Sequence, residues 1–220
     1  MASYAVITSV WGDYWERFGE GFIKNVQGLS PQPDEVIVAS SVPIDLPEGF
    51  TNVISDVMMW DSFNDAVKAS SAEWVWPVGV DDRFCVGAFD GLPVDCDVVS
   101  VTGVRSDNGG LFQADADAYS WMLNNPNNPM SGSIVMQRHV WDSCLWRRVI
   151  WPDWVQWLEI NKLGFNVKFD RVDRFTFVRH DGAHSARPSS SGQQQCDDMR
   201  KILREYNVVP GVEFPPQILK

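Results

Sequence analysis

The stretch EWVWPVGVDDRF, from Glu73 to Phe84, combines an apolar segment with an acidic end. Its apolar, strand-forming residues run continuously over Trp74–Val80 and end abruptly in two adjacent carboxylates, Asp81 and Asp82. A continuous apolar run is typical of a strand that is covered on both faces of a sheet, as in parallel α/β proteins. In open α/β sheets, ligands bind outside the carboxyl ends of the strands. The pattern therefore predicts a buried strand that delivers two acids to a binding edge.

Strands and helices are expected to alternate around this stretch. The sequence predicts strands at Tyr4–Val10, Glu35–Ser40, Asn52–Ser55, Trp74–Val80 and Cys96–Val104. Asp13 is placed to cap a helix with an apolar side that runs to Val26, and Ser62 with Asp65 forms a capping-box variant that opens a helix over Ser62–Ser71. This repeated order predicts an α/β fold with a mainly parallel central sheet flanked by helices.

The second half of the chain is less regular. Asp107–Met130 is rich in Asn, Asp, Gly and Pro and predicts a long loop or lid. Further predicted elements are a strand at Gly132–Arg138, a helix at Asp153–Leu163 that stops at Gly164, and strands at Asn166–Phe169 and Phe175–Val178. We expect one domain over residues 1–187. We expect residues 188–220 to form a C-terminal helical extension. It comprises a linker by composition at Arg187–Gln195, a short helix at Asp197–Tyr206 and a tail.

The composition narrows the class of protein. A chain of 220 residues that is 45% hydrophobic suits one domain with a sizeable core. Its 18 basic and 29 acidic residues give a formal net charge of −11, which argues against nucleic-acid binding because that needs basic patches. The cysteines form no CxxC pair, so free thiols are expected. The N-terminus lacks the pattern of a signal peptide and no run is long and apolar enough to span a bilayer, so we expect a cytoplasmic protein with no membrane contact.

Asp81 and Asp82 have two interpretations when taken by themselves. Two carboxylates at a strand end offer hard oxygen ligands for Mg²⁺ or Mn²⁺, and such a cation can bind a diphosphate. Alternatively, the two acids cap a following helix near Arg83 or form a polar turn. Spacing alone does not separate the two interpretations.

The segment FNDAVKASSAEWVWPVGVDDRF resembles the central segment of the GT-A-fold glycosyltransferases, particularly of family 2. In that family an Asn-containing helix leads into a strand that ends in Asp-x-Asp or Asp-x-Asp-Asp. Asn64 matches the helix Asn, Ala72–Val75 matches the run into the strand, and Gly79–Asp82 occupies the acidic position. The resemblance implies a GT-A (Rossmann-like) fold, a nucleotide-diphosphate sugar as donor and a divalent metal. It gives Asp81 the role of metal ligand with Asp82 in support, and Gly79 replaces the acid that mainly contacts the donor ribose.

A second similarity lies in WPDWVQWLEINKLGFNVKF, where the interval from Asp153 to Gly164 fits the family's Glu-Asp helix and the glycine that follows it. Pro152 replaces the usual Glu. In inverting members the Asp is the catalytic base, so the resemblance gives that role to Asp153, which would take the proton from the acceptor hydroxyl. Without the resemblance, an Asp at a helix start is more simply an N-cap.

Other positions match the family less specifically. Thr8, Ser9 and Trp11 occupy its nucleotide-binding edge after the first strand, and Ser40 lies where the family commonly has an acid that helps to hold the base. Many GT-A enzymes place a late His near the metal or diphosphate, and the candidates are His180 and His184, with Arg179 able to pair with phosphate. The alternative for these histidines is an ordinary polar loop.

The resemblance therefore implies a metal-dependent glycosyltransferase that moves a sugar from a nucleotide-diphosphate sugar to the hydroxyl of a protein, glycan or small molecule. Asp153 as base implies inversion, although a retaining outcome stays open. The alternatives are a catalytically inactive GT-A-like binding module and a nucleotidyltransferase, although the chain lacks the Gly-rich basic loop near its N-terminus that sugar nucleotidyltransferases use. The oligomeric state is left open.

Overall fold

The computed structural model describes residues 2–55, 59–106, 109, 111–112, 134–147, 149, 152–178, 197 and 201–206. The loop expected at Asp107–Met130 lies almost entirely outside these residues, and the expected linker and the tail after Tyr206 lie wholly outside them. The strands are β1 (Tyr4–Val10), β2 (Glu35–Ser40), β3 (Phe50–Ile54), β4 (Trp74–Pro77), β5 (Arg83–Phe84), β6 (Val98–Arg105), β7 (Leu111–Phe112), β8 (Ile134–Gln137) and β9 (Val167–Phe177). The helices are α1 (Tyr14–Gln27), α2 (Met59–Ala69), α4 (Arg138–Ser143) and α5 (Pro152–Leu163).

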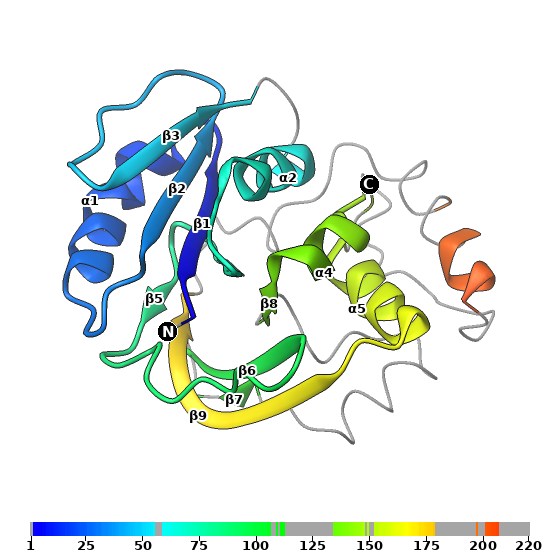
Figure 1. The fold of residues 1–220 in the computed structure, drawn as a ribbon. Coiled ribbons are helices and arrows are strands. Elements are labelled where there is room, and N and C mark those ends of the chain that lie inside the picture. Colours follow the sequence, from blue (N-terminus) through cyan, green and yellow to red (C-terminus); the bar gives the residue numbers. More distant parts are fainter. Residues whose placement is uncertain are drawn as a thin grey trace.

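One sheet holds all these strands in the order β3-β2-β1-β4-β8-β6-β9-β5, with β7 paired to β6 (Figure 1). The first four neighbours are parallel, so β3, β2, β1 and β4 all end at the same carboxyl edge. β8 then runs antiparallel to both β4 and β6, and β6 pairs in parallel with β9. This arrangement confirms the expected α/β fold, but the sheet is mixed, because β5 with β9 and β6 with β7 are also antiparallel and the parallel part is concentrated in the first half of the chain.

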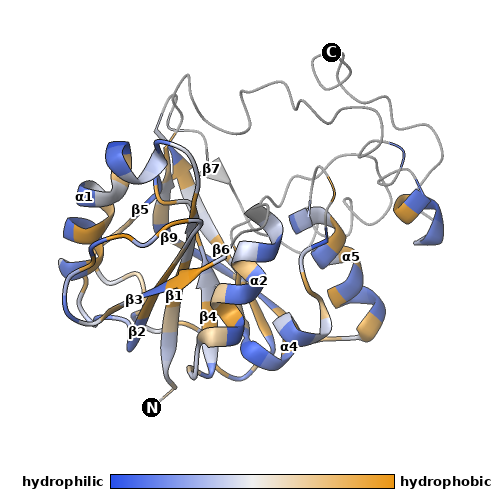
Figure 2. Ribbon diagram, turned by 90° about the horizontal axis from the view of Figure 1, so that it is seen from above, coloured by the Kyte–Doolittle hydropathy of each residue, from blue (hydrophilic) through white to orange (hydrophobic). Residues whose placement is uncertain are grey.

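The two faces of the parallel strands are covered by different helices. α1 lies on one side of β1 and β2, whereas α2, α4 and α5 lie on the other (Figure 1). Alternate residues of β1 serve the two cores: Val6 packs in the cluster of α1 residues Phe22 and Val26, and Ile7 packs in the cluster that holds Phe63 and Trp157. Hydrophobic colouring is strong in the strands between α1 and α2 (Figure 2). Both faces are buried, which explains the continuous apolar runs in the sequence.

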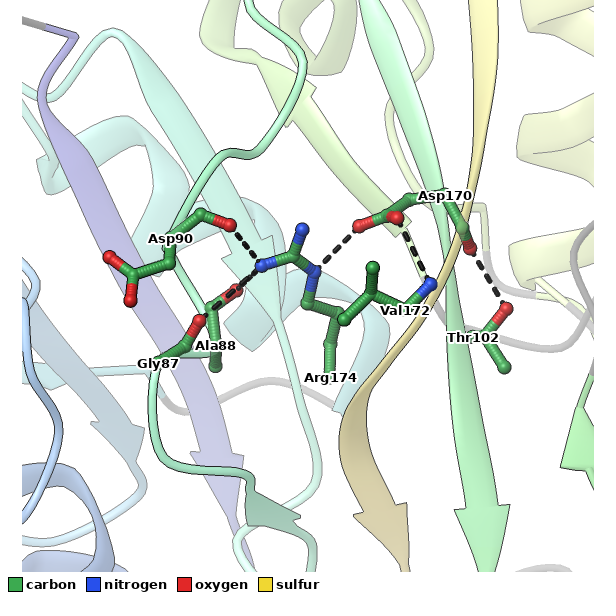
Figure 3. Close-up of polar contacts among 7 residues, drawn as sticks. All are labelled: Gly87, Ala88, Asp90, Thr102, Asp170, Val172 and Arg174. Atoms are coloured by element: carbon green, nitrogen blue, oxygen red, sulfur yellow. Dashed lines mark hydrogen bonds and ion pairs between the residues drawn. The ribbon is translucent and has the colours of Figure 1, made fainter.

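β9 is one strand where the sequence predicted two. The charged stretch between the predicted strands contains a bulge, because Val101 of β6 pairs with Asp170 and Thr102 pairs with Asp173. Arg174 donates to the Asp170 carboxylate at 2.6 Å, and both side chains are at most 10% exposed. Arg174 also donates to the carbonyls of Gly87, Ala88 and Asp90, as Figure 3 shows. The bulge therefore satisfies its charges locally, so β9 continues through a sequence that reads as a break.

Other details of the predicted elements also differ from the structure. α2 begins at Met59, so Ser62 and Asp65 lie inside the helix and do not form a capping box. Asp13 occupies the N-cap position of α1, but its side chain makes no capping hydrogen bond. β4 ends at Pro77 instead of Val80, because the chain turns over the next residues.

The described C-terminal residues agree with the predicted short helix, since Asp197 and residues 201–205 are helical. Ile202 and Leu203 are buried in the same core cluster as α5. The Tyr206 hydroxyl donates to Glu159 of α5 at 3.2 Å. The described end of the chain therefore packs against the α/β domain. No helix in the described part of the chain combines the length and apolar character needed to cross a membrane.

Candidate functional site

The two acids after β4 lie on a tight turn. Val78 still donates its backbone N–H to Ile7 of β1 at 2.9 Å, and the chain then reverses, with the Asp82 N–H donating to the Gly79 carbonyl at 3.1 Å. The Arg83 guanidinium folds back over this turn and donates to the carbonyls of Val80, Asp81 and Asp82 at 3.2, 3.1 and 2.7 Å. We call Gly79–Asp82 the acidic turn. It follows the carboxyl end of β4, so the alternative in which these acids cap a new helix is wrong: the next element is strand β5.

Both carboxylates of the acidic turn lie over Gly79. A Cβ atom on residue 79 would lie 2.5 Å from Asp81 Oδ1 and 3.0 Å from Asp82 Oδ2. The Asp82 carboxylate accepts the Gly79 N–H at 3.2 Å with one oxygen and the Val178 N–H at 3.1 Å with the other. The end of β9 is thereby joined to the acidic turn. Asp82 is a structural bridge as well as an acid of the site.

Burial and the closeness of the two carboxylates disfavour two negative charges in the acidic turn at once. Burial, and secondly the charge of Asp81, raise the pKa of Asp82 to about 8, while the two backbone N–H donors and Arg83 act in the opposite direction. Two carboxylates that share one site repel each other, and a cation bound there would relieve that repulsion.

The donor set fits a divalent cation that is completed by a ligand. In the described part of the chain, no three His, Cys, Asp or Glu side chains come together as a closed metal centre. Mg²⁺ is commonly held by only one or two carboxylates, with waters and substrate phosphates as the remaining ligands. Asp81, with Asp82 beside it, supplies that kind of partial site. The residues therefore fit a metal ion that binds together with a diphosphate.

Of the residues predicted at the end of β1, Thr8 borders the acidic turn, and the hydroxyls of both Thr8 and Ser9 are engaged within the protein. Thr8 is fully buried and donates to the Val78 carbonyl at 2.9 Å. Ser9 is 3% exposed and shares a hydrogen bond of 2.5 Å with Ser62 of α2. Thr8 and Ser9 thus hold β1 to the start of the turn and to α2. Trp11 is partly exposed, and its ring stacks on Tyr14 at a centroid distance of 5.0 Å.

Ser40, predicted to contact the donor base, is 2% exposed at the end of β2. Its hydroxyl donates to the Val42 carbonyl at 2.7 Å and accepts from the Asn52 amide at 2.7 Å. The Asn52 side chain also accepts the Ile44 N–H, so these contacts together shape the loop after β2. In this structure Ser40 orders that loop through its hydroxyl.

Asn64 on α2 holds the segment that leads to α5. Its side-chain oxygen accepts both the Trp146 backbone N–H and the Trp141 indole N–H at 3.1 Å, and its amide donates to the Trp146 carbonyl at 2.9 Å. The Trp146 indole N–H in turn donates to Gln156 of α5 at 2.8 Å. A continuous chain of hydrogen bonds therefore joins α2 to α5 through Trp146. We call Asn64, Trp146 and Gln156 the Trp146 clamp.

Asp153, the predicted base, lies in the first turn of α5, partly exposed. The helix begins at Pro152, so Asp153 is already inside it and does not occupy the N-cap position. Gly164, with a φ of 76°, follows the last helical residue, and Asn166 bonds to Asp97 ahead of the amino end of β6. A helix of 12 residues places its first turn roughly 18 Å from its other end. Asp153 is therefore at the end of α5 that is remote from the amino edge of the sheet.

Three predicted residues, Arg179, His180 and His184, lie outside the described residues. Val178, which directly precedes Arg179 in the chain, is bonded to Asp82 as described above. An open groove of about 480 Å³ lies elsewhere, between the end of α1 and the starts of β2 and β3. It is at the amino edge of the parallel strands and so does not belong to the acidic turn.

Sequence reasoning missed two residues that build the site. Arg83 directly follows the two acids, and its guanidinium donates to the carbonyls of the acidic turn. Its place beside the acids is the signal that could have indicated this role. Gln156 is 1% exposed within a helix of large apolar residues, and it bonds to both Trp146 and the Cys144 carbonyl. A glutamine flanked on both sides by large apolar residues is the signal that could have indicated a buried polar link.

The fold is shared with known glycosyltransferases. Residues 1–349 of TarS from S. aureus, crystallised with UDP-GlcNAc, are 13% identical, with a TM-score of 0.67 over 92% of this chain and 66% of that one. Mannosyltransferase PcManGT from Pyrobaculum calidifontis, in complex with GDP-Man and Mn²⁺, is 14% identical, with a TM-score of 0.65 over 99% of this chain and 67% of that one. No protein-family model and no curated protein matches the sequence. The chain thus spans about two thirds of these structures, and it has the GT-A-like glycosyltransferase fold that the sequence resemblance implied.

Proposed function

We propose that this protein is a metal-dependent glycosyltransferase that transfers a sugar from a nucleotide-diphosphate sugar to an acceptor hydroxyl. The observation that carries the proposal is the acidic turn at the carboxyl end of β4, where two carboxylates converge on Gly79 in the middle of a glycosyltransferase-like sheet. This is the edge at which open α/β sheets bind their ligands. Among solved structures with this fold, one carries UDP-GlcNAc and another carries GDP-Man with Mn²⁺.

On the donor side, Asp81 would hold the cation, and Asp82 would orient the acidic turn through its bonds to Gly79 and Val178. A divalent cation, when bound, would stabilise the negative charge that grows on the diphosphate leaving group. Trp11 offers a partly exposed aromatic face at the end of β1 to the nucleotide. Arg179, His180 and His184 remain candidates for contacts to the diphosphate and the cation, on the sequence resemblance alone.

On the acceptor side, we assign the role of base to Asp153. The carboxyl end of α5 leads to Asn166, which bonds ahead of the amino end of β6, so the first turn of α5 is the end of the helix farther from that edge. A carboxylate there would accept the proton of the acceptor hydroxyl as its oxygen attacks the anomeric carbon, and the outcome is inversion. The Trp146 clamp fixes the approach of the chain to this helix, so Asn64 acts in positioning α5 instead of binding the donor.

The substitution of Asp153 by Asn tests this assignment, because it removes the base and keeps the shape of the side chain. We expect donor binding to persist within about threefold while transfer to an added hydroxyl acceptor falls by about 10²-fold or more. The control is Asp142→Asn, an exposed acid near the end of α4, which should leave both properties unchanged. Unchanged transfer by Asp153→Asn contradicts the assignment. Donor binding by the wild type without transfer to any acceptor class supports the inactive binding module instead.

A further inference from the structure

Gly79 has no room for a side chain, although its backbone conformation would permit one. The described glycines with a positive φ are Gly12, Gly49, Gly87, Gly91, Gly109 and Gly164, and Gly79 is not one of them. An L-residue could therefore adopt the backbone conformation of residue 79. Its Cβ, however, would meet the carboxylate oxygens of Asp81 and Asp82 at 2.5 and 3.0 Å, closer than the contacts that real Cβ atoms make.

We propose that Gly79 is a positioning residue of the cation site: the missing side chain lets both carboxylates lie over residue 79 and lets Asp82 bridge the acidic turn to β9. A side chain at this position therefore weakens the site, even when that side chain is itself an acid. The cation part of this proposal rests on the proposed function, whereas the bridge to β9 does not.

The atoms that a new Cβ would displace belong to the acids and not to the core. Its nearest neighbours are the ends of the Asp81 and Asp82 side chains, which can rotate away without moving the backbone. Val78 remains bonded to Ile7, and the Arg83–Thr176 and Phe84–Phe175 pairs of β5 and β9 lie outside the collision. The protein should therefore still fold, and the disturbance falls on the carboxylates.

Displacement of the Asp82 carboxylate has a second, local consequence. One of its oxygens accepts the Val178 N–H, and the other accepts the N–H of Gly79 itself. If the carboxylate rotates away, both N–H groups lose their acceptor. The Val178 amide then reports on the arrangement of the acidic turn without any metal or substrate.

The resemblance places an acid where this chain has Gly79, so Gly79→Asp is the most informative variant. A third carboxylate would raise cation affinity if the site merely lacked charge. The proposal gives the opposite expectation, because the added Cβ separates the two carboxylates that are already present.

The experiment measures two properties of the full chain, with Gly79→Ala, Gly79→Asp and a control, Gly28→Ala. Gly28 follows α1 with a φ of −83°, and its nearest contacts are backbone carbonyls of α1. Amide hydrogen exchange of Val178 is followed by NMR without metal or nucleotide. Mn²⁺ binding is followed by electron paramagnetic resonance of the free ion in the presence of UDP or of GDP, with the nucleotide alone as blank, because a diphosphate is expected to complete the site. We expect Val178 to exchange at least tenfold faster and Mn²⁺ to bind at least tenfold more weakly in both Gly79 variants, with no change in the control.

Unchanged Val178 exchange in Gly79→Ala, or tighter Mn²⁺ binding by Gly79→Asp, would overturn the proposal. These results are separable from a failure of the proposed function. Faster Val178 exchange in the variants, with no Mn²⁺ binding by the wild type in the presence of either nucleotide, supports the positioning role and contradicts the metal site. Sugar transfer by the wild type with identical behaviour of Gly79→Ala contradicts the positioning role and leaves the proposed function intact.

Discussion

The Asp82 carboxylate accepts the backbone N–H of Val178 at 3.1 Å, which joins the turn after β4 to the end of β9 across 96 positions of sequence. This contact ties the parallel half of the sheet to its mixed half at the edge where the acids lie. The first prediction follows directly from it. Asp82→Ala leaves the Gly79 and Val178 N–H groups without their acceptor, and we expect a loss of roughly 1–3 kcal/mol in the free energy of unfolding, measured by urea denaturation. Asp95→Asn, which alters an exposed acid, is the control.

A gain of stability in Asp82→Ala would contradict this account. It would mean that relief of the repulsion from Asp81 outweighs the two hydrogen bonds.

The Trp146 clamp makes a second prediction. Asn64→Ala removes the partner of two donors and one acceptor, so we expect a loss of roughly 2–3 kcal/mol at about 1 kcal/mol for each bond. Asn64→Asp keeps an oxygen that can accept from Trp141 and Trp146, but at pH 7 it sets a charged oxygen against the Trp146 carbonyl, so we expect it to lose at least as much as Asn64→Ala. Urea denaturation of both variants measures the two losses. A smaller loss in Asn64→Asp would show that the accepting oxygen alone holds the clamp.

The buried pair of Arg174 and Asp170 makes a third prediction. Arg174→Met leaves Asp170 as an uncompensated buried charge and frees three loop carbonyls, so the expected loss of stability is about 3–5 kcal/mol. Lys168→Met breaks the more exposed pair with Asp95 and should change stability far less, because an ion pair in water contributes little. Thermal and chemical unfolding of the two variants make the comparison. Similar losses in both would contradict the structural role of the bulge network.

Alkaline pH gives a fourth prediction. Burial, followed by the charge of Glu159, raises the pKa of Cys144 from 9.0 to about 12 and that of Tyr206 from 10.0 to about 12. The folded protein therefore retains these two protons to higher pH than the unfolded chain, so the contribution of Cys144 and Tyr206 to stability is complete below about pH 9 and is lost as the pH rises toward 12. Urea unfolding at a series of pH values measures this fall. Tyr206→Phe should flatten the part above pH 10, and an unchanged slope in that variant would disprove its contribution.

Much of the fold could be predicted because burial on two faces leaves a plain signal. The apolar runs at Tyr4–Val10 and Glu35–Ser40 became β1 and β2 with the predicted bounds, and Gly164 ended α5 as expected. β9 could not be predicted, because the polar stretch at its bulge reads as a loop until Arg174 and Asp170 are known to pair. Local pattern does not reveal charges that neutralise each other inside a bulge.

The candidate site, like the fold, could be predicted where the signal is local and could not be predicted where it depends on tertiary contacts. The sequence correctly predicted that the acids follow a buried strand, because that relation is local. It could not predict that Asp82 bonds Val178, or that Asn64 bonds Trp146 at a separation of 82 residues. Such contacts depend on how the chain returns to the sheet. The sequence therefore indicates which residues can do chemistry, and only the tertiary contacts show which of them have a structural task.

The central claim is that Asp81 helps to bind a nucleotide-diphosphate sugar through a divalent cation. Its most direct test is the thermal stability of the wild type and Asp81→Asn with UDP-, GDP- and TDP-sugars, each with and without Mn²⁺. At a donor concentration of 100 times the Kd, binding adds about 2.7 kcal/mol, which raises the Tm by roughly 5–10 °C for a chain of this size. We predict that at least one donor stabilises the wild type only when Mn²⁺ is present, and that Asp81→Asn abolishes this stabilisation. An absence of Mn²⁺-dependent stabilisation by every donor, or equal stabilisation of Asp81→Asn, would contradict the claim.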